Sequence, residues 1–179
     1  MFYEVLGDEP VSAERRAATE QLMAANKKNE NIICTSVACH LEVIPSKLTE
    51  KDVDDERQYL NLFDHVHFVD IEISTNVLML AREIKDYYFR PVKNGNSAKM
   101  MDTVDAIHLA TAIINNVDEF HTRDDSSKGS KVPLVSLYTW SGKGKVCDRY
   151  PLEIISPESP QGNLNLTGGR DVSAKSEPR

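Results

Sequence analysis

The chain has 179 residues, a length typical of a single domain, of which 40% are hydrophobic and 27% are charged. Its formal net charge of −7 and isoelectric point near 5.2 argue against a protein that binds nucleic acid through a large basic surface. An enzyme that contacts nucleic acid through metals and a few local cations is compatible with this charge.

Short helices and strands are predicted to alternate along the chain. In the first half, the predicted elements are a helix from Pro10 to the break at Asn29, a strand over residues 32–35, a helix over 36–44 capped by Ser36, a helix over 52–63 and a strand over 65–71. In the second half, they are an amphipathic helix capped by Ser74, a buried helix beginning at Asp102-Thr103, and strands over 119–122, 132–137 and 152–155. This order predicts an α/β fold with a mainly parallel sheet.

The last part of the chain differs in composition from the rest. Residues 157–179 are rich in Pro, Gly, Ser and Asn and contain few apolar residues. Such a stretch buries too little surface to offset the entropy lost on ordering it. We therefore predict a domain over residues 1–156 and a flexible tail over residues 157–179.

Several features indicate a cytoplasmic protein. No apolar run approaches the length of about 18 residues that a membrane span needs, and the first residues lack the basic and long apolar segments of a signal peptide. The cysteines, Cys34, Cys39 and Cys147, are odd in number and include no CxxC pair. We interpret them as reduced, apolar residues, and we expect no membrane partner.

Three acidic residues lie where strand ends are expected to converge. Glu42 follows the strand that ends at Thr35, Asp105 begins the most buried helix, and Asp124 lies just past the strand that ends at Thr122. Carboxylates close together near an apolar core repel, and a divalent cation such as Mg²⁺ relieves the repulsion. Taken singly, each acid is equally typical of a helix cap, a turn or a solvated surface.

Two parts of the sequence resemble the motifs of a known family. The segment DAIHLATA over residues 105–112, followed by a strand that ends TRD at residues 122–124, is similar to the C-terminal motif of PIN domains. PIN domains are the metal-dependent nucleases that include the VapC toxins. Upstream, TSV at residues 35–37 and LEV at residues 41–43 resemble the family segment that supplies its second acid.

The resemblance implies a three-layer α/β fold with a central, mainly parallel sheet flanked by helices. It implies a metal-dependent endoribonuclease, the toxin of a type II toxin–antitoxin pair, with Mg²⁺ or Mn²⁺ as cofactor. Glu42, Asp105 and Asp124 would be its catalytic and metal-binding residues, Thr122 the hydroxyl residue before the last acid, and Asp125 an auxiliary acid. The implied partners are an RNA substrate, an antitoxin protein and a second copy in a homodimer.

The first acid of the family pattern is missing from its expected place. Family members begin with a hydrophobic strand that ends in an Asp, whereas residues 2–10 resemble the stretch after that strand. Neither Glu4 nor Asp8 stands at the expected position. Two explanations stay open: a start assigned too far downstream, or a true truncation that leaves a catalytically impaired PIN-like binding module.

Other polar residues each allow a functional and a structural interpretation. His65 and His67 could form a metal pair on one strand face, but no third ligand accompanies them at a suitable spacing. His108, three residues after Asp105, could approach the acids or simply pack within its helix. A basic group could contact phosphates or be solvated, and it consists of Lys85, Arg90, Lys93 and Lys99. A phospho-acceptor receiver domain is disfavoured because no paired acids follow an early strand.

Overall fold

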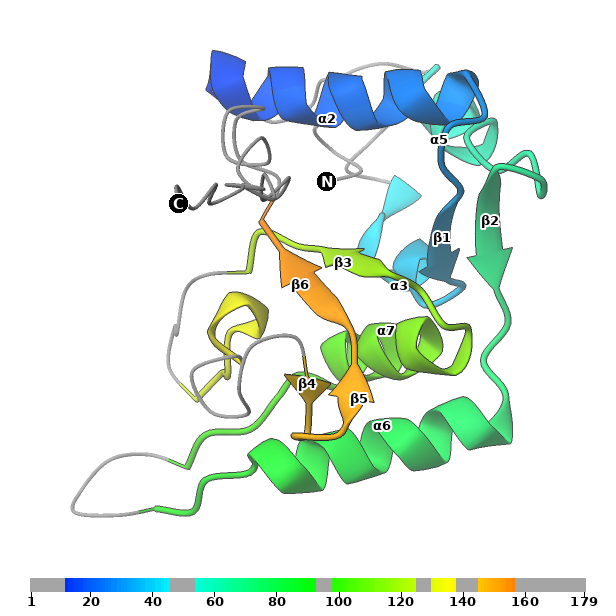
Figure 1. Ribbon diagram of the computed structural model, residues 1–179. Coiled ribbons are helices and arrows are strands. Elements are labelled where there is room, and N and C mark those ends of the chain that lie inside the picture. Colours follow the sequence, from blue (N-terminus) through cyan, green and yellow to red (C-terminus); the bar gives the residue numbers. More distant parts are fainter. Residues whose placement is uncertain (1–11, 46–53, 93–97, 125–129, 138–144, 157–179) are drawn as a thin grey trace, which may run out of the picture.

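Helices and short parallel strands make up the fold in the computed structural model, which describes residues 12–45, 54–92, 98–124, 130–137 and 145–156 (Figure 1). The helices are α2 (Ala13–Lys27), α3 (Cys39–Glu42), α5 (Asp55–Leu60), α6 (Thr75–Tyr88), α7 (Thr103–Ile114) and a 3-10 helix over Leu134–Ser136. The strands are β1 (Ile33–Ser36), β2 (Phe68–Ile71), β3 (Glu119–His121), β4 (Lys145–Val146), β5 (Tyr150–Pro151) and β6 (Glu153–Ile155). Within these ranges, no helix is both long and apolar enough to cross a bilayer.

The strands pair mainly in parallel, which confirms the predicted α/β class, although the sheet is small. Strand β1 pairs with β2, and β3 pairs with β6, both in parallel, while β4 and β5 form a short antiparallel pair. Helix α7 packs against both α6 and β1. The carboxyl end of β1 therefore lies close to α7, and this contact positions the candidate site.

Helices α6 and α7 form where their patterns predict them. Ser74 caps α6, since its side chain accepts a hydrogen bond from the Val77 amide at 3.3 Å. Asp102 caps α7 in the same way through the Val104 amide, at 2.9 Å. The buried residues of α7 include Ala106, Leu109 and Ala110, so the helix is anchored in the core while its first turn reaches the site.

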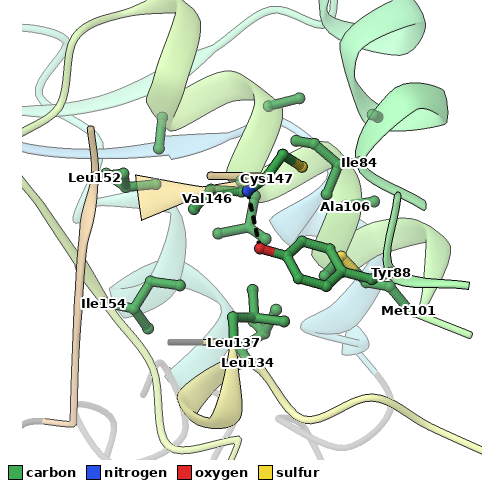
Figure 2. Close-up of a cluster of buried hydrophobic side chains, with 14 of the residues drawn as sticks. Ile84, Tyr88, Met101, Ala106, Leu134, Leu137, Val146, Cys147, Leu152 and Ile154 are labelled. Carbon is green, nitrogen blue, oxygen red and sulfur yellow. Dashed lines mark hydrogen bonds between the residues drawn. The ribbon is translucent and has the colours of Figure 1, made fainter. Parts of the chain in front are cut away.

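The main core lies between these two helices and the C-terminal strands (Figure 2). Tyr88, at the end of α6, is completely buried, and its hydroxyl accepts a hydrogen bond from the Cys147 amide at 2.9 Å. Burial raises the pKa of the Cys147 thiol to about 12. This thiol is therefore protonated at neutral pH, in agreement with its interpretation as an apolar residue, and all three cysteines are free.

We expect Tyr88→Phe to lower the free energy of unfolding by about 1–3 kcal/mol, because it leaves the buried Cys147 amide without its acceptor. Denaturant unfolding followed by circular dichroism measures this loss. Tyr87→Phe is the matched control: its hydroxyl donates to Asp148 at the surface, so a change below about 0.5 kcal/mol is expected. Equal losses in the two variants would contradict the role assigned to the buried bond.

The prediction of a strand over residues 132–137 is wrong. Leu134–Ser136 form a 3-10 helix after Pro133. The Leu134 amide donates to Asp124 Oδ2 at 3.1 Å, and the Val135 amide donates to the Asp124 carbonyl at 3.1 Å. Because these two amides hydrogen-bond to the loop after β3, they cannot take part in a strand ladder.

The predicted helix over residues 36–44 is shorter than expected. Ser36 belongs to β1, where it pairs with Ile71, and the helix that follows is a single turn, α3. The Ser36 side chain does accept a hydrogen bond from the Ala38 amide, at 3.2 Å. Residues 52 and 53, at the start of the next predicted helix, lie outside the described residues, and α5 covers Asp55–Leu60.

Strand β2 begins at Phe68, so the prediction of a strand from residue 65 is wrong at its start. The Asp64 carboxylate accepts hydrogen bonds from the amides of Val66, His67 and Phe68, which turn the chain and lower the Asp64 pKa well below its usual value. His65 contacts Asp70 and His67 contacts Asp64. The two imidazoles thus pair with different carboxylates instead of sharing one strand face.

Candidate functional site

Asp105 and Asp124 lie on either side of one lysine. The Lys131 ammonium is 3.0 Å from Asp105 Oδ2 and 3.5 Å from Asp124 Oδ2. Lys131 is held in place by its backbone, because its neighbours Ser130 and Val132 both hydrogen-bond to the backbone of Met100. Two acids that are far apart in the sequence are thus brought together around a positive charge.

Asp105 is the more buried of the two acids. It lies in the first turn of α7, and its side chain is 13% exposed. Burial raises the pKa of Asp105 above its ordinary value, the nearby charges of Asp124 and Asp102 add to the rise, and Lys131 opposes it. For Lys131, burial alone would lower the pKa, yet the hydrogen bond and charge of Asp105 raise it on balance. Lys131 therefore keeps its positive charge between the two carboxylates.

Asp124 is oriented by backbone contacts at the end of β3. Its Oδ2 accepts a hydrogen bond from the Leu134 amide, and its own amide donates to Thr122 Oγ1 at 3.2 Å. Arg123, next to it, donates to the Arg15 carbonyl and to Thr19 Oγ1 on α2. The strand end is thus fixed from both sides, and the carboxylate is held toward Lys131.

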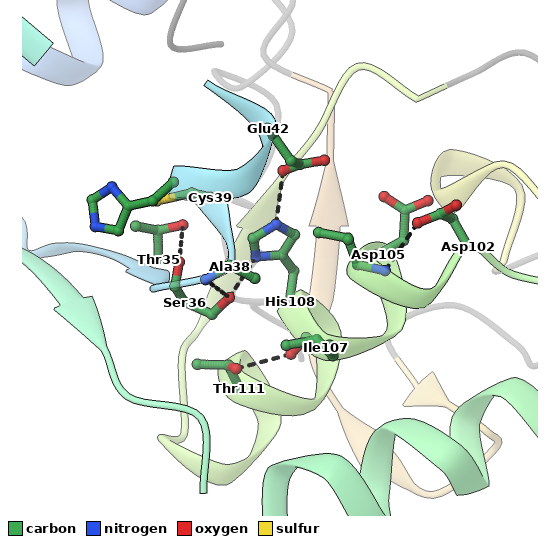
Figure 3. A network of polar contacts seen from close by, with 12 residues as sticks. Thr35, Ser36, Ala38, Cys39, Glu42, Asp102, Asp105, Ile107, His108 and Thr111 are labelled. Atoms are coloured by element: carbon green, nitrogen blue, oxygen red, sulfur yellow. Dashed lines mark hydrogen bonds and ion pairs between the residues drawn. The ribbon is translucent and has the colours of Figure 1, made fainter. Parts of the chain in front are cut away.

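Glu42 does not join the two aspartates around Lys131. It lies at the end of α3, and its Oε2 is 2.9 Å from Nε2 of His108 on α7 (Figure 3). His108 Nδ1 is 3.0 Å from Ser36 Oγ at the end of β1. Within the part of the chain that the structure describes, no three Asp, Glu, His or Cys side chains are arranged to hold a metal ion.

The site is nevertheless built around one helix. Asp105 and His108 are three residues apart on α7, and side chains at this spacing are neighbours on one helix face. Asp105 binds Lys131, and His108 binds Glu42. The three predicted acids are therefore arranged as an aspartate pair at the first turn of α7 and a separate glutamate that contacts His108, one turn further along the same helix.

Lys131 and Ser36 were not expected at the site from the sequence. Lys131 lies in a loop, and no motif or periodicity in the sequence links it to Asp105 or Asp124. For His108, the sequence left open whether the side chain approaches the acids or packs within its helix, and the structure shows it in contact with Glu42. Asp125, predicted as an auxiliary acid, and residues 2–10, on which the prediction of a missing strand depends, lie outside the described residues.

Comparison with known proteins identifies a family. The family model described as PIN domain matches residues 6–128. The chain belongs to the PIN domain family. The matched range contains both aspartates and Glu42, as well as Ser36 and His108. No curated protein and no solved structure gives a significant match to the chain.

PIN domains are in general metal-dependent nucleases that act on RNA, and the site's donor groups suit such a metal. Asp105 and Asp124 offer hard carboxylate oxygens, which Mg²⁺ and Mn²⁺ prefer. The Lys131 ammonium already lies between these oxygens, so the aspartate pair accommodates a cation. The residues of this PIN domain therefore fit a divalent ion at the aspartate pair.

Proposed function

We propose that this PIN domain is a metal-dependent endoribonuclease in which Asp105, Asp124 and Glu42 hold Mg²⁺ or Mn²⁺. The observation that carries the proposal is the pairing of two largely buried aspartates around the Lys131 ammonium. Burial raises the pKa of Asp105, and a nearby cation favours its ionised form. Membership of the PIN family supports a metal ion as the cation used in catalysis.

The chain's own residues have distinct tasks in this proposal. A bound divalent ion would supply charge stabilisation at the phosphate and a more acidic water molecule. Asp105 provides a fixed, buried carboxylate, because α7 is anchored in the core. Asp124 provides a second carboxylate, oriented by the Leu134 amide and Thr122. Lys131, whose side chain is 39% exposed, can contact a phosphate oxygen once another cation neutralises the aspartates.

We further propose that the nuclease is the toxin of a type II toxin–antitoxin pair. The support for this narrower role is the resemblance of residues 105–112 and 122–124 to the motif of the family that includes the VapC toxins. On this proposal the chain acts in the cytoplasm, pairs as a homodimer and is inhibited by an antitoxin protein. Expression of the chain alone should arrest growth of a bacterial host, and the Asp105→Asn variant should not.

Removal of divalent metal tests the proposed activity directly. We expect the purified chain to cleave structured RNA in the presence of Mg²⁺, to lose this activity in EDTA and to regain it when Mg²⁺ or Mn²⁺ is added in excess. Cleavage is followed by gel electrophoresis of end-labelled RNA. RNA binding without cleavage at any metal concentration would contradict the proposal and support the alternative of a catalytically impaired binding module.

A further inference from the structure

A continuous row of hydrogen-bonding groups connects the end of β1 to Glu42 (Figure 3). The Ala38 amide donates to Ser36 Oγ, Ser36 Oγ lies 3.0 Å from His108 Nδ1, and His108 Nε2 lies 2.9 Å from Glu42 Oε2. Ser36 is buried, and the side chain of His108 is 12% exposed, whereas that of Glu42 is 50% exposed. The row thus extends from the interior to a carboxylate at the surface.

The direction of these hydrogen bonds follows from their partners. The Glu42 carboxylate only accepts, so His108 Nε2 must carry a proton to make a favourable contact at 2.9 Å. In the neutral ring Nδ1 is then an acceptor, and the Ser36 hydroxyl donates to it while its oxygen accepts from the Ala38 amide. The Glu42 carboxylate therefore selects the His108 tautomer, and the Ser36 hydroxyl stabilises it by donating to Nδ1.

We propose that Ser36 and His108 are positioning residues that hold the Glu42 carboxylate against α7, the helix that carries Asp105, for metal binding. This inference rests on the proposed function, because it assumes that Glu42 is a metal ligand. His108 acts through Glu42 and not on the substrate. Its position on α7, one turn after Asp105, fixes the glutamate relative to the helix that carries the buried aspartate.

Glu42 needs such support because of where it lies. It is the last residue of a one-turn helix that has no side-chain cap, and half of its side chain is exposed. A glutamate side chain loses rotamer entropy when it is fixed in one orientation. The hydrogen bond to the largely buried His108 fixes the glutamate before a metal binds, so less entropy is lost on metal binding. In metal sites, residues that orient ligands in this way typically contribute 10- to 100-fold to metal affinity.

The first test is Mn²⁺ affinity of the full chain, measured by electron paramagnetic resonance of free Mn²⁺. We expect His108→Leu to weaken binding about 10- to 100-fold. We expect His108→Gln to stay within a few-fold of the original chain, because its amide can still donate to Glu42. His67→Leu is the matched control, because His67 also contacts a carboxylate, that of Asp64, but lies at the opposite end of the β1–β2 pair. The Mn²⁺ affinity of this variant should equal that of the original chain.

The second test is the tautomer of His108 in the metal-free chain, read from ¹⁵N NMR of labelled histidines at pH 8 and assigned with His108→Gln. We expect a protonated Nε2 and an unprotonated Nδ1, and we expect Ser36→Ala to increase the population of the other tautomer. A ring protonated at Nδ1 in the original chain would overturn the inference whatever the chain does with metal or RNA.

The outcomes separate this inference from the proposed function. If Glu42→Gln loses Mn²⁺ affinity and His108→Leu keeps it, the positioning role is wrong and the metal site stands. If the original chain binds no Mn²⁺, both proposals fail. If His108→Leu binds Mn²⁺ more weakly and His108→Gln binds it like the original chain, the hydrogen bond donated to Glu42 is the reason. Glutamine differs from histidine in shape, so a general loss of packing would weaken both variants.

Discussion

Asp105→Asn is expected to reduce Mg²⁺-dependent RNA cleavage by more than about a hundredfold. Residues that only orient metal ligands contribute about 10- to 100-fold, so the loss of a direct ligand should exceed that range. Asparagine has nearly the same shape as aspartate, but it lacks the negative charge that attracts a cation to the buried end of α7. Initial cleavage rates at saturating Mg²⁺, with and without the substitution, measure the effect.

The same substitution should leave the fold intact. Burial raises the folded-state pKa of Asp105 above its unfolded value, so the stability that this group contributes is present at low pH and is lost as the pH rises through the folded-state pKa. At neutral pH the ionised carboxylate is therefore a net cost to folding, and neutral asparagine removes it. We expect the melting temperature of Asp105→Asn to be no lower than that of the original chain at neutral pH, and its difference from the original chain to shrink at acidic pH.

Asp118→Asn is the matched control for this loss of activity. Asp118 is an exposed acid just before β3, and the change in charge is identical. Its cleavage rate should stay within about twofold of the original chain, since surface substitutions away from a site have small effects. Cleavage by Asp105→Asn at the rate of the Asp118→Asn control would show that the metal-site assignment is wrong.

The elements that sequence patterns predicted best are those whose local signals and tertiary contacts agree. Helix α6 has a Ser cap and apolar residues at helical spacing, and each of the signals is used in the structure: Ser74 caps it, and Val77, Ala81, Ile84 and Tyr88 are buried. Helix α7 is similar, because its Asp102 cap and its apolar sequence both indicate a buried helix. Where a cap and an apolar pattern both predict a helix and the tertiary packing buries the same residues, the helix forms as predicted.

The elements that were predicted wrongly lie where an aspartate binds backbone amides that a strand would need. Residues 132–137 were predicted as a strand because short apolar runs are typical of strands, yet the amides of Leu134 and Val135 bind Asp124 in the loop after β3. Residues 65–67 read as the start of a strand because apolar and polar residues alternate, but the Asp64 carboxylate binds three successive amides there. In both places an aspartate side chain competes with the strand ladder for the backbone.

Sequence patterns locate the three candidate acids on their elements, but not their arrangement in space. The positions of Asp105 and Asp124 follow from a helix start and a strand end, which sequence patterns locate. The pairing of both aspartates with Lys131, and of Glu42 with His108, depends on how a loop and a one-turn helix pack against α7. Side-chain partners of this kind have no periodicity in the sequence, so only the structure shows them.

Lys131→Met is expected to destabilise the metal-free chain and to make it more responsive to Mg²⁺. Without the ammonium, Asp105 and Asp124 face each other with no cation between them. Breaking a fully buried ion pair costs about 3–5 kcal/mol, but the side chain of Lys131 is 39% exposed, so solvent screening reduces the expected loss to about 1–2 kcal/mol. Thermal unfolding without metal measures this loss, which corresponds to a fall of roughly 2–8 °C in melting temperature.

Mg²⁺ should then stabilise Lys131→Met more than the original chain, because the cation no longer competes with the ammonium for the two carboxylates. Lys145→Met, which removes an exposed lysine from β4, should show the same small shift with Mg²⁺ as the original chain. The double variant Asp124→Asn/Lys131→Met should be more stable without metal than Lys131→Met alone, since it removes the repulsion, and it should lose the enlarged response to Mg²⁺. Equal shifts with Mg²⁺ in Lys131→Met and the original chain would mean that the ammonium and the metal do not occupy the same place, and the aspartate pair would then not be the metal site.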